Sequence, residues 1–192
     1  MFIRSERLFL RPGWAEDRAE LQGLTAEETR APRLACAGVP YVSDEVPGFL
    51  QPANDPFLPR FLVTLPGPDG ARVIGCICLA RHDGEVELGY WIAHDLWGHG
   101  YATEAVRAVL GLAHMLGHRR IVASHFHDRP ESGEILRAAG FRRTGRSSER
   151  HCPARAGLST ALEYVFATEE TAGGGGSDVD GNGWDGSRRH AA

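Results

Sequence analysis

The chain has 192 residues, of which 42% are hydrophobic and 24% are charged, and its net charge is −4. This length and composition are typical of one globular domain, and an acidic balance argues against a nucleic-acid-binding footprint. All 21 basic side chains are arginine, and lysine is absent. The composition therefore excludes NTPases that need a phosphate-loop lysine, protein kinases, and enzymes that form a Schiff base through lysine.

The cysteines and the first residues bear on the cellular compartment. Cys36, Cys76, Cys78 and Cys152 show no C-x-x-C spacing, so we expect reduced, mostly buried thiols in a cytoplasmic protein. Residues 1–10 carry charges throughout, which is untypical of a signal peptide. No run of 18 apolar residues predicts a membrane span.

The N-terminal part of the chain gives weak secondary-structure signals. Residues 2–11 are predicted to form one strand, and leucines at helical spacing predict a helix over residues 16–28. Residues 31–59 contain six prolines and are the least regular part of the sequence. We expect one short helix there, near residues 43–51, and a surface loop.

The middle of the chain is predicted as an antiparallel meander. Strong turn sequences at residues 66–70 and 82–84 separate three segments of strand composition. The three predicted strands are residues 60–65, 72–81 and 85–92.

Helical periodicity begins after residue 92. Residues 100–116 place alanine, valine and leucine on one stripe, which predicts a long amphipathic helix. A strand over residues 120–126 and a helix over residues 131–139 follow. Two last strands are predicted over residues 141–150 and 158–168.

These elements predict an α+β fold with a central mixed, mostly antiparallel sheet of about seven strands and about four flanking helices. We expect one domain over residues 1–170. Residues 171–192 are rich in glycine, serine and aspartate, which predicts a disordered tail.

The strongest chemical signal lies where the third meander strand gives way to the long helix. The sequence Trp97-Gly-His-Gly-Tyr-Ala102 contains a G-x-G turn directly before a helix. Backbone N–H groups and the helix dipole at such a junction favour a pyrophosphate, and glycine lets the ligand approach the backbone. The alternative interpretation is a turn that uses Gly98 and Gly100 only for their backbone conformation.

This stretch resembles motif A of the GNAT (Gcn5-related) N-acetyltransferases, in the version of the RimJ/RimL-like branch. That family's loop pattern, [Q/R]-x-x-G-x-[G/A], matches from Trp97 to Ala102. The resemblance extends over about residues 2–168, because further blocks follow in the family's order. These blocks are Arg4–Pro12, Val73–Gly75, Glu87–Trp91, and Asp128–Ser132 continued by Ala139–Phe141.

The resemblance implies a GNAT-like fold that binds acetyl-CoA as co-substrate and uses no metal. Two neighbouring strands are expected to separate and to hold the pantetheine arm between them, with fixed N–H donors near the thioester that stabilise an oxyanion. Backbone groups of Trp91, Ile92 and Ala93 are implied as pantetheine partners. The pyrophosphate is implied to bind N–H groups of Gly98, His99, Gly100, Tyr101, Ala102 and Thr103.

Three positions depart from the family's usual residues. Trp97 replaces glutamine or arginine at the first loop position, and His99 replaces a frequent lysine or arginine. Arg129 replaces the asparagine that usually meets pantetheine. An arginine there either reaches a CoA phosphate, since its fork matches phosphate geometry, or is a solvated surface side chain.

His125 and His127 lie on one strand face but lack a third metal ligand in register.

Acetylation of an amine needs a base for the amine and a proton for the departing thiolate. Glu87, on the strand that leads to the cofactor, resembles the family's acidic site, whereas Glu149 in the penultimate strand is a rival base. Ser132 matches the branch's serine, which is implied to polarise or protonate the CoA sulfur. The alternative for Glu87 is an exposed strand carboxylate that faces arginine or water. The alternative for Ser132 is a cap or first-turn hydroxyl that bonds the backbone of the predicted helix.

The resemblance implies direct acetyl transfer in a ternary complex to a primary amine, either a protein N-terminal α-amine or a small molecule. The alternative is a catalytically inactive CoA-binding or interaction module of the same fold. No nucleic-acid or membrane partner is expected, and the protein is expected to be a monomer or a homodimer. Besides the two acidic candidates, the acceptor slot is expected to include Tyr41, Phe49, Phe57 and Arg155.

Overall fold

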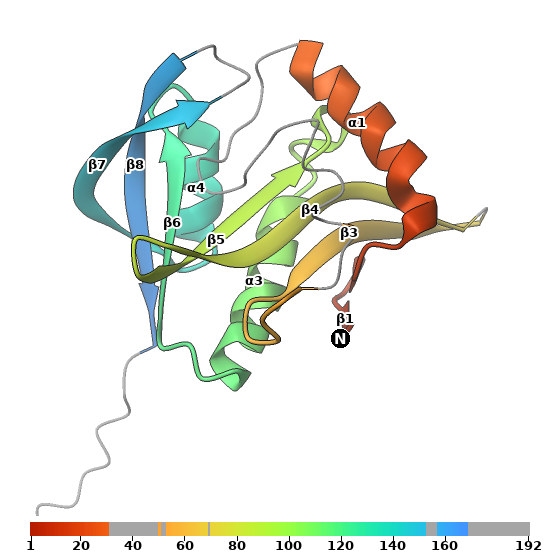
Figure 1. Ribbon diagram of the computed structural model, residues 1–192, viewed down its shortest axis with the longest axis horizontal. Coiled ribbons are helices and arrows are strands. Elements are labelled where there is room, and N and C mark those ends of the chain that lie inside the picture. The colour runs from red at the N-terminus through yellow and green to blue at the C-terminus, as the bar shows by residue number, and fades with distance from the viewer. Residues whose placement is uncertain (31–49, 51–52, 69, 153–156, 169–192) are drawn as a thin grey trace, which may run out of the picture.

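The computed structural model describes residues 1–30, 50, 53–68, 70–152 and 157–168, which form one twisted sheet with helices on both faces (Figure 1). The strand order is β1-β2-β3-β4-β5-β6-β8-β7. The described strand pairs are antiparallel except β5–β6, which is parallel. The strands are β1 (Ile3–Arg4), β2 (Phe9–Arg11), β3 (Arg60–Gly67), β4 (Gly70–His82), β5 (Glu85–Ile92), β6 (Arg120–Phe126), β7 (Arg142–Cys152) and β8 (Gly157–Ala167).

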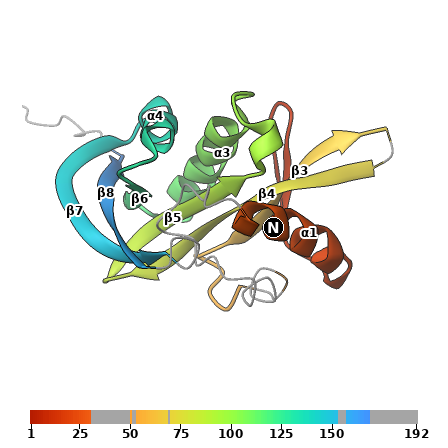
Figure 2. The same cartoon turned by 90° about the horizontal axis from the view of Figure 1, so that it is seen from above.

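Three α-helices flank the sheet in the described part of the chain. Figure 2 shows α3 and α4 on one face of the sheet and α1 on the opposite face. The apolar stripe predicted for the long helix is the buried face of α3. The helices are α1 (Arg18–Arg30), α3 (Tyr101–Met115) and α4 (Pro130–Ala138), with short 3-10 helices η1 (Ala15–Asp17) and η3 (His94–Leu96).

Strand β5 is buried on both of its faces, because side chains alternate along it and helices cover both sides. Leu88 and Tyr90 belong to the larger hydrophobic core, which also includes residues of α3 and α4. Trp91 packs in a second cluster with Leu21 of α1. Since Glu87 is four residues before Trp91, its side chain lies on the α1 face of the sheet.

Strands β5 and β6 share a single residue pair, Glu87 with Val122. Beyond that pair β5 continues to Ile92 and β6 continues to Phe126 without pairing to each other. The predicted separation of two neighbouring strands therefore falls between β5 and β6. The backbone of β5 after Glu87 borders an opening in the sheet on that side.

The predicted fold class is confirmed, but the N-terminal stretch differs from the prediction. Residues 2–11 form the two strands β1 and β2 rather than one, so the sheet has eight strands instead of about seven. The chain turns back at residues 5–8, where the N–H of Ser5 donates to the carbonyl of Leu8 at 3.0 Å. The helix expected near residues 43–51 falls almost wholly outside the described residues. The tail from residue 171, and with it the predicted domain boundary, also lies outside them.

A buried ion pair fixes the start of η1 and α1. Arg11 donates from Nη1 and Nη2 to the two carboxylate oxygens of Asp17, each at 2.7 Å, and both side chains are buried. The carboxylate also accepts from the N–H of Trp14 at 2.7 Å, and the guanidinium lies 4.1 Å from the centre of the Trp14 ring. The hydrogen bond from Arg11 is the main reason that the pKa of Asp17 is lowered.

Replacing Asp17 with alanine is expected to lower the free energy of unfolding at pH 7 by about 3 kcal/mol, because Arg11 then stays buried without its counter-charge. Because folding lowers the pKa of Asp17, its contribution is present above about pH 4 and is lost as pH falls through the folded-state value. Urea unfolding at pH 7 and pH 3 measures both effects, and the variant should lose less stability on acidification than the unmodified protein.

The matched control is Asp95→Ala, which removes an exposed carboxylate paired with Arg72 at 2.9 Å. Exposed pairs contribute about 0–1 kcal/mol, so this variant should unfold almost like the unmodified protein. Equal losses of unfolding free energy for the two substitutions would contradict a stabilising role for the buried Arg11–Asp17 pair.

Candidate functional site

A cavity of about 440 Å³ lies at the opening, between the end of β5, the first turn of α3 and the length of α4. It brings together all of the predicted cofactor-binding residues except Ala93 and His99. Most of the accessible lining is apolar, which suits a flexible organic chain more than a free ion. The predicted residues that line it are Trp91, Ile92, Trp97, Gly98, Gly100, Tyr101, Ala102, Thr103, Arg129 and Ser132.

The G-x-G turn forms the wall of the cavity at the start of α3. Gly98 and Gly100 have φ angles of +79° and +78°, a left-handed conformation that other residues rarely adopt. Gly100 is the N-cap of α3, and its carbonyl accepts the first helical hydrogen bond, from the N–H of Glu104. The N–H groups of Tyr101, Ala102 and Thr103 therefore have no acceptor within the helix, which makes this turn suited to an anion.

Trp97 connects the turn to the end of β5. Its indole Nε1 donates to the carbonyl of Ile92 at 2.7 Å, so the unusual tryptophan fastens the loop to the strand at the cavity. The neighbouring Ala93 lies outside the cavity lining and packs in the second cluster. Its N–H donates to the carbonyl of Ile74 at 2.8 Å, which leaves that N–H unavailable to a ligand.

The side chain of His99 does not line the cavity. Its Nδ1 lies 3.0 Å from the carbonyl oxygen of Trp97 and 3.2 Å from that of Leu96. Because carbonyl oxygens only accept hydrogen bonds, Nδ1 carries the proton in this arrangement. The ring stacks on Tyr101, with centroids 5.7 Å apart, so the imidazole shapes the loop, and only the backbone N–H of His99 remains a predicted pyrophosphate donor.

Helix α4 supplies the opposite wall of the cavity. Ser132 is buried in its first turn and lines the cavity, whereas the N-cap position is held by Arg129, without a side-chain capping bond. Ser132 therefore does not hold the N-cap position, but it does lie in the first turn, where the alternative interpretation also placed it. Arg129 is half-buried and also lines the cavity, so it is not a fully solvated side chain. Its contact with a CoA phosphate stays a prediction.

Helix α4 approaches β6 and β8 at a glycine. A Cβ on Gly133 would lie 2.7 Å from His125 Nε2 and 2.8 Å from the Tyr164 hydroxyl. His125 is buried, its Nδ1 lies 2.8 Å from the carbonyl oxygen of Phe126, and burial lowers its pKa. It is thus a packed neutral imidazole beneath α4. Among the residues the structure describes, no group of three or more metal-ligating side chains comes together.

Glu87 lies outside the cavity lining, where it forms the single β5–β6 residue pair with Val122, and its side chain is on the α1 face of the sheet. Its side chain is 2% exposed, so the alternative interpretation was wrong about exposure, although the carboxylate does face an arginine as that interpretation expected. Nη1 of Arg150 in β7 lies 2.9 Å from each of its oxygens. Arg150 was not predicted from the sequence, where its only signal was its position next to Glu149 in a predicted strand.

Glu149 is exposed on β7, where one of its oxygens accepts from the Thr160 hydroxyl of β8 at 2.6 Å. Because side chains alternate along a strand, Glu149 and Arg150 point to opposite faces. The two predicted bases therefore occupy different environments. Of the predicted acceptor-slot residues, Phe57 is 54% exposed, and Tyr41, Phe49 and Arg155 lie outside the described residues.

Comparison with known proteins agrees with this geometry. A family model described as acetyltransferase (GNAT) domain matches residues 7–142. No curated protein sequence matches the chain. In the described residues, no helix combines the length and the apolar character needed to cross a membrane.

Solved structures share the fold at low sequence identity. A GNAT-family acetyltransferase from Bacillus anthracis is 21% identical, with a TM-score of 0.68 over 87% of this chain and 98% of the other. The acetyltransferase from Salmonella typhimurium that modifies the N-terminal serine of ribosomal protein L7/L12 is 16% identical, with a TM-score of 0.69 over 88% of this chain and 100% of the other. The L7/L12 α-N-acetyltransferase RimL in complex with coenzyme A is 15% identical, with a TM-score of 0.69 over 87% and 98%.

Replacing Gly133 with alanine is expected to lower the free energy of unfolding by about 1–3 kcal/mol, because the new methyl group overlaps His125 and Tyr164 and overpacks the α4 contact. Gly111→Ala in α3 is the matched control, since no atom outside the adjoining helix backbone lies within 4 Å of the position that its methyl group would take. Alanine favours a helix by about 1 kcal/mol over glycine, so the control should be stabilised. Thermal unfolding of both variants measures the contrast, and two stabilised variants would contradict the close α4 contact.

Proposed function

The chain belongs to the GNAT acetyltransferase family, and we propose that it transfers the acetyl group of acetyl-CoA directly to a primary amine within a ternary complex. The acceptor is proposed to be a protein N-terminal α-amine or a small-molecule primary amine. The observation that carries this proposal is the opening where β5 and β6 part. The cavity lies along it, and Glu87 lies at its closed end with its side chain on the α1 face.

GNAT acetyltransferases use acetyl-CoA, which supplies the acetyl group as a reactive thioester. The lining fits this co-substrate, because it joins backbone N–H donors of the Gly98–Thr103 turn to a largely apolar channel beside Trp91 and Ile92. We propose that the turn holds the pyrophosphate and that Arg129 contributes a charge to a phosphate. The absence of lysine does not impair this binding, since a helix N-terminus and backbone N–H groups act as the anion site.

We propose Glu87 as the group that takes the proton from the acceptor amine, directly or through one water. An α-amino group has a pKa of about 8, whereas a lysine amine has one of about 10.4, so a modest base suffices for the former. Glu87 is buried, and Arg150 holds its carboxylate oxygens in a fixed orientation. Arg150 is therefore a positioning residue, which orients the Glu87 carboxylate at the point where the strands part.

Ser132 is proposed to assist the leaving thiolate from the other side of the opening. It is buried in the first turn of α4 and lines the cavity, where its hydroxyl can donate to sulfur. Glu149 is the weaker candidate for the base, since it is exposed and engaged with Thr160.

One observation favours a second function, a CoA-binding or interaction module without catalysis. Both oxygens of Glu87 accept from Arg150, so a buried arginine contact accounts for this carboxylate even without a role as a base. The two functions predict the same binding of acetyl-CoA and differ in thiol release. We further propose that the protein works in the cytoplasm as a monomer or homodimer, consistent with the buried, unlinked Cys76 and Cys78.

Acetyl-CoA is expected to raise the melting temperature of the purified protein, because a ligand of the native state stabilises it by about 2.7 kcal/mol at 100 times its Kd. For a chain of this size that corresponds to a rise of about 5–10 °C. Gly100→Val should reduce the rise, since valine disfavours the left-handed backbone of the turn. An unchanged melting temperature at millimolar acetyl-CoA would refute the proposed co-substrate site.

Glu87→Gln is expected to lower kcat for an amine acceptor by about 10²- to 10⁴-fold, the usual contribution of a general base, without changing the affinity for acetyl-CoA. Release of CoA thiol is measured with a panel of small amines and peptides, each peptide also supplied with an acetylated N-terminus as a blank. Glu149→Gln is the matched control on β7 and should retain kcat. Loss of activity in Glu149→Gln alone would identify Glu149, and not Glu87, as the base. If no amine gives thiol release, the non-catalytic module is favoured.

A further inference from the structure

The turn of the N-terminal hairpin, at residues 5–8, binds the carboxylate of Glu104 in the first turn of α3. One oxygen of Glu104 accepts from the Ser5 hydroxyl at 2.8 Å and from the N–H of Arg7 at 2.7 Å. Its other oxygen accepts from Nε and Nη2 of Arg7, each at 2.8 Å. Partial burial opposes the ionisation of Glu104, but the hydrogen bonds from Arg7 and Ser5 outweigh it and lower its pKa.

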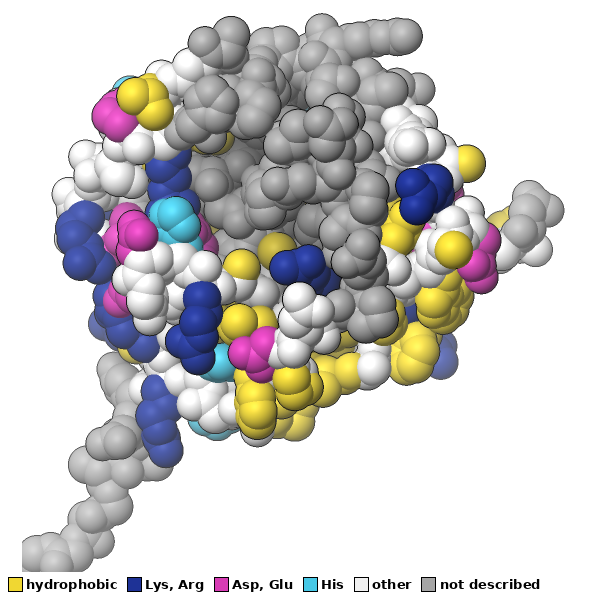
Figure 3. Space-filling view, in the orientation of Figure 1, with side chains coloured by type: hydrophobic (Ala, Val, Ile, Leu, Met, Phe, Trp, Pro, Cys, Tyr) yellow, Lys and Arg dark blue, Asp and Glu magenta, His cyan; other side chains and the backbone are white. Residues whose placement is uncertain are grey.

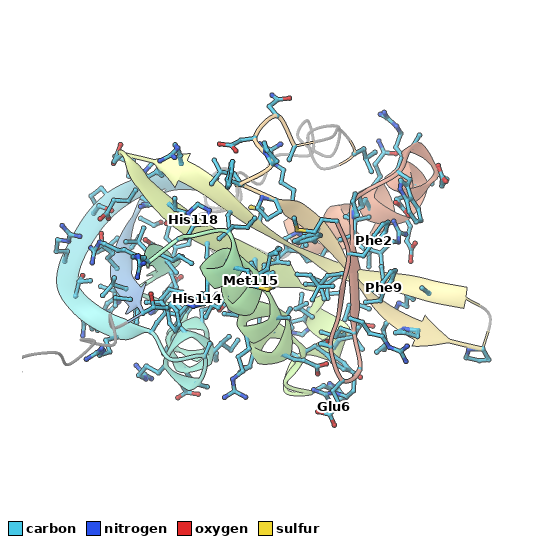
Figure 4. The ribbon with its side chains drawn as sticks, turned by 90° about the horizontal axis from the view of Figure 1, so that it is seen from below. Phe2, Glu6, Phe9, His114, Met115 and His118 are labelled. Carbon is cyan, nitrogen blue, oxygen red and sulfur yellow. The ribbon has the colours of Figure 1, made fainter. Side chains whose placement is uncertain are left out.

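The same guanidinium also contacts the pyrophosphate turn itself. Nη1 of Arg7 donates to the carbonyl of His99 at 3.0 Å, and the guanidinium carbon lies 4.6 Å from the centre of the Tyr101 ring. Nη2 is the nearest atom to the position that a Cβ on Gly100 would take, at 3.5 Å. Figure 4 shows the hairpin running beside α3, with the labelled Glu6 at the hairpin tip next to the segment that enters the helix.

These contacts meet two physical needs of the turn. Glycine has more backbone freedom than other residues, so ordering Gly98 and Gly100 costs more conformational entropy. Contacts from outside the loop are therefore needed to hold its N–H groups in one direction. Trp97 anchors the side of the loop that faces β5, and Arg7 anchors its other side at His99. Arg7 also neutralises Glu104, whose negative charge would otherwise lie one helical turn from the bound pyrophosphate.

We infer that Arg7 is a positioning residue for the pyrophosphate turn and that the Arg7–Glu104 pair sets the affinity for the nucleotide half of CoA. The inference rests on acetyl-CoA as the co-substrate and is independent of the acceptor. Lysine at position 7 would supply the charge but not the fork that reaches the Glu104 carboxylate and the His99 carbonyl together.

Calorimetric titration of the full chain with CoA and with acetyl-pantetheine tests the inference, because acetyl-pantetheine lacks the pyrophosphate and the nucleotide. Arg7→Met is expected to raise the Kd for CoA at least tenfold and to change the Kd for acetyl-pantetheine less than twofold. Arg7→Lys should raise the Kd for CoA by a smaller factor, of about threefold or more, and should likewise leave the Kd for acetyl-pantetheine almost unchanged. Arg7→Met with Glu104→Gln should recover part of the lost CoA affinity, since the second change removes the exposed negative charge.

Arg146→Met is the matched control, because it breaks an arginine–glutamate pair with Glu163 on β8. Figure 3 shows acidic and basic side chains interspersed on the side of the molecule where Figure 1 places β7 and β8. The control should bind both ligands like the unmodified protein. The inference is overturned by less than a threefold change for CoA in Arg7→Met, or by equal weakening of both ligands, which indicates a merely structural role.

Circular dichroism establishes that each variant is folded before titration. If Arg7→Met does not fold, Arg7→Lys carries the test by the same criterion, a loss confined to CoA. Binding of CoA by the unmodified protein is measured in the same series without any acceptor. Failure to find an acceptor amine would therefore not affect the role inferred for Arg7. If an acceptor is found but the Arg7 variants bind CoA with unaltered affinity, only the inference about Arg7 is overturned.

Discussion

The parting of β5 and β6 after one residue pair is the constraint on which the site depends. If the two strands paired along their full length, the backbone groups of β5 after Glu87 would be hydrogen-bonded to β6 and the cavity would close. Because they separate, the start of α3 and the length of α4 line one cavity beside β5. The two-sided core, with α1 on one face and α3 and α4 on the other, keeps β5 in place despite the lost pairing.

Arginine–carboxylate pairs hold both ends of this opening. Arg7 and Glu104 lie at the G-x-G turn before α3, and Arg150 and Glu87 lie where the strands part. A chain without lysine uses arginine for every such contact, and the planar guanidinium allows one side chain to engage a carboxylate, a carbonyl and an aromatic ring together. The absence of lysine is thus compatible with a site organised by fixed, multidentate contacts.

Local sequence patterns predicted most of the elements, because hydrophobic periodicity and glycine turns act over a few residues. The predicted bounds of β5 and β6 were confirmed, and those of α3 and α4 were off by one residue at each end. The N-terminal hairpin was missed, since residues 5–8 lack the glycine or proline that usually marks a turn. That turn is instead supported by tertiary contacts with Glu104 of α3, which no local pattern encodes.

The fold class, the family and the glycine turn could be predicted from the amino-acid sequence, because each rests on short local motifs and on their order along the chain. The pairing of the charged groups could not, since it joins distant parts of the chain. Arg7 and Glu104 are 97 residues apart, and Glu87 and Arg150 are 63 residues apart. The strand order puts β1 and β7 at opposite edges of the sheet, yet in the folded chain Arg7 reaches α3 and Arg150 reaches β5. Such pairing depends on where the sheet carries each strand, so the burial of Glu87 and the exposure of Glu149 became visible only in the folded chain.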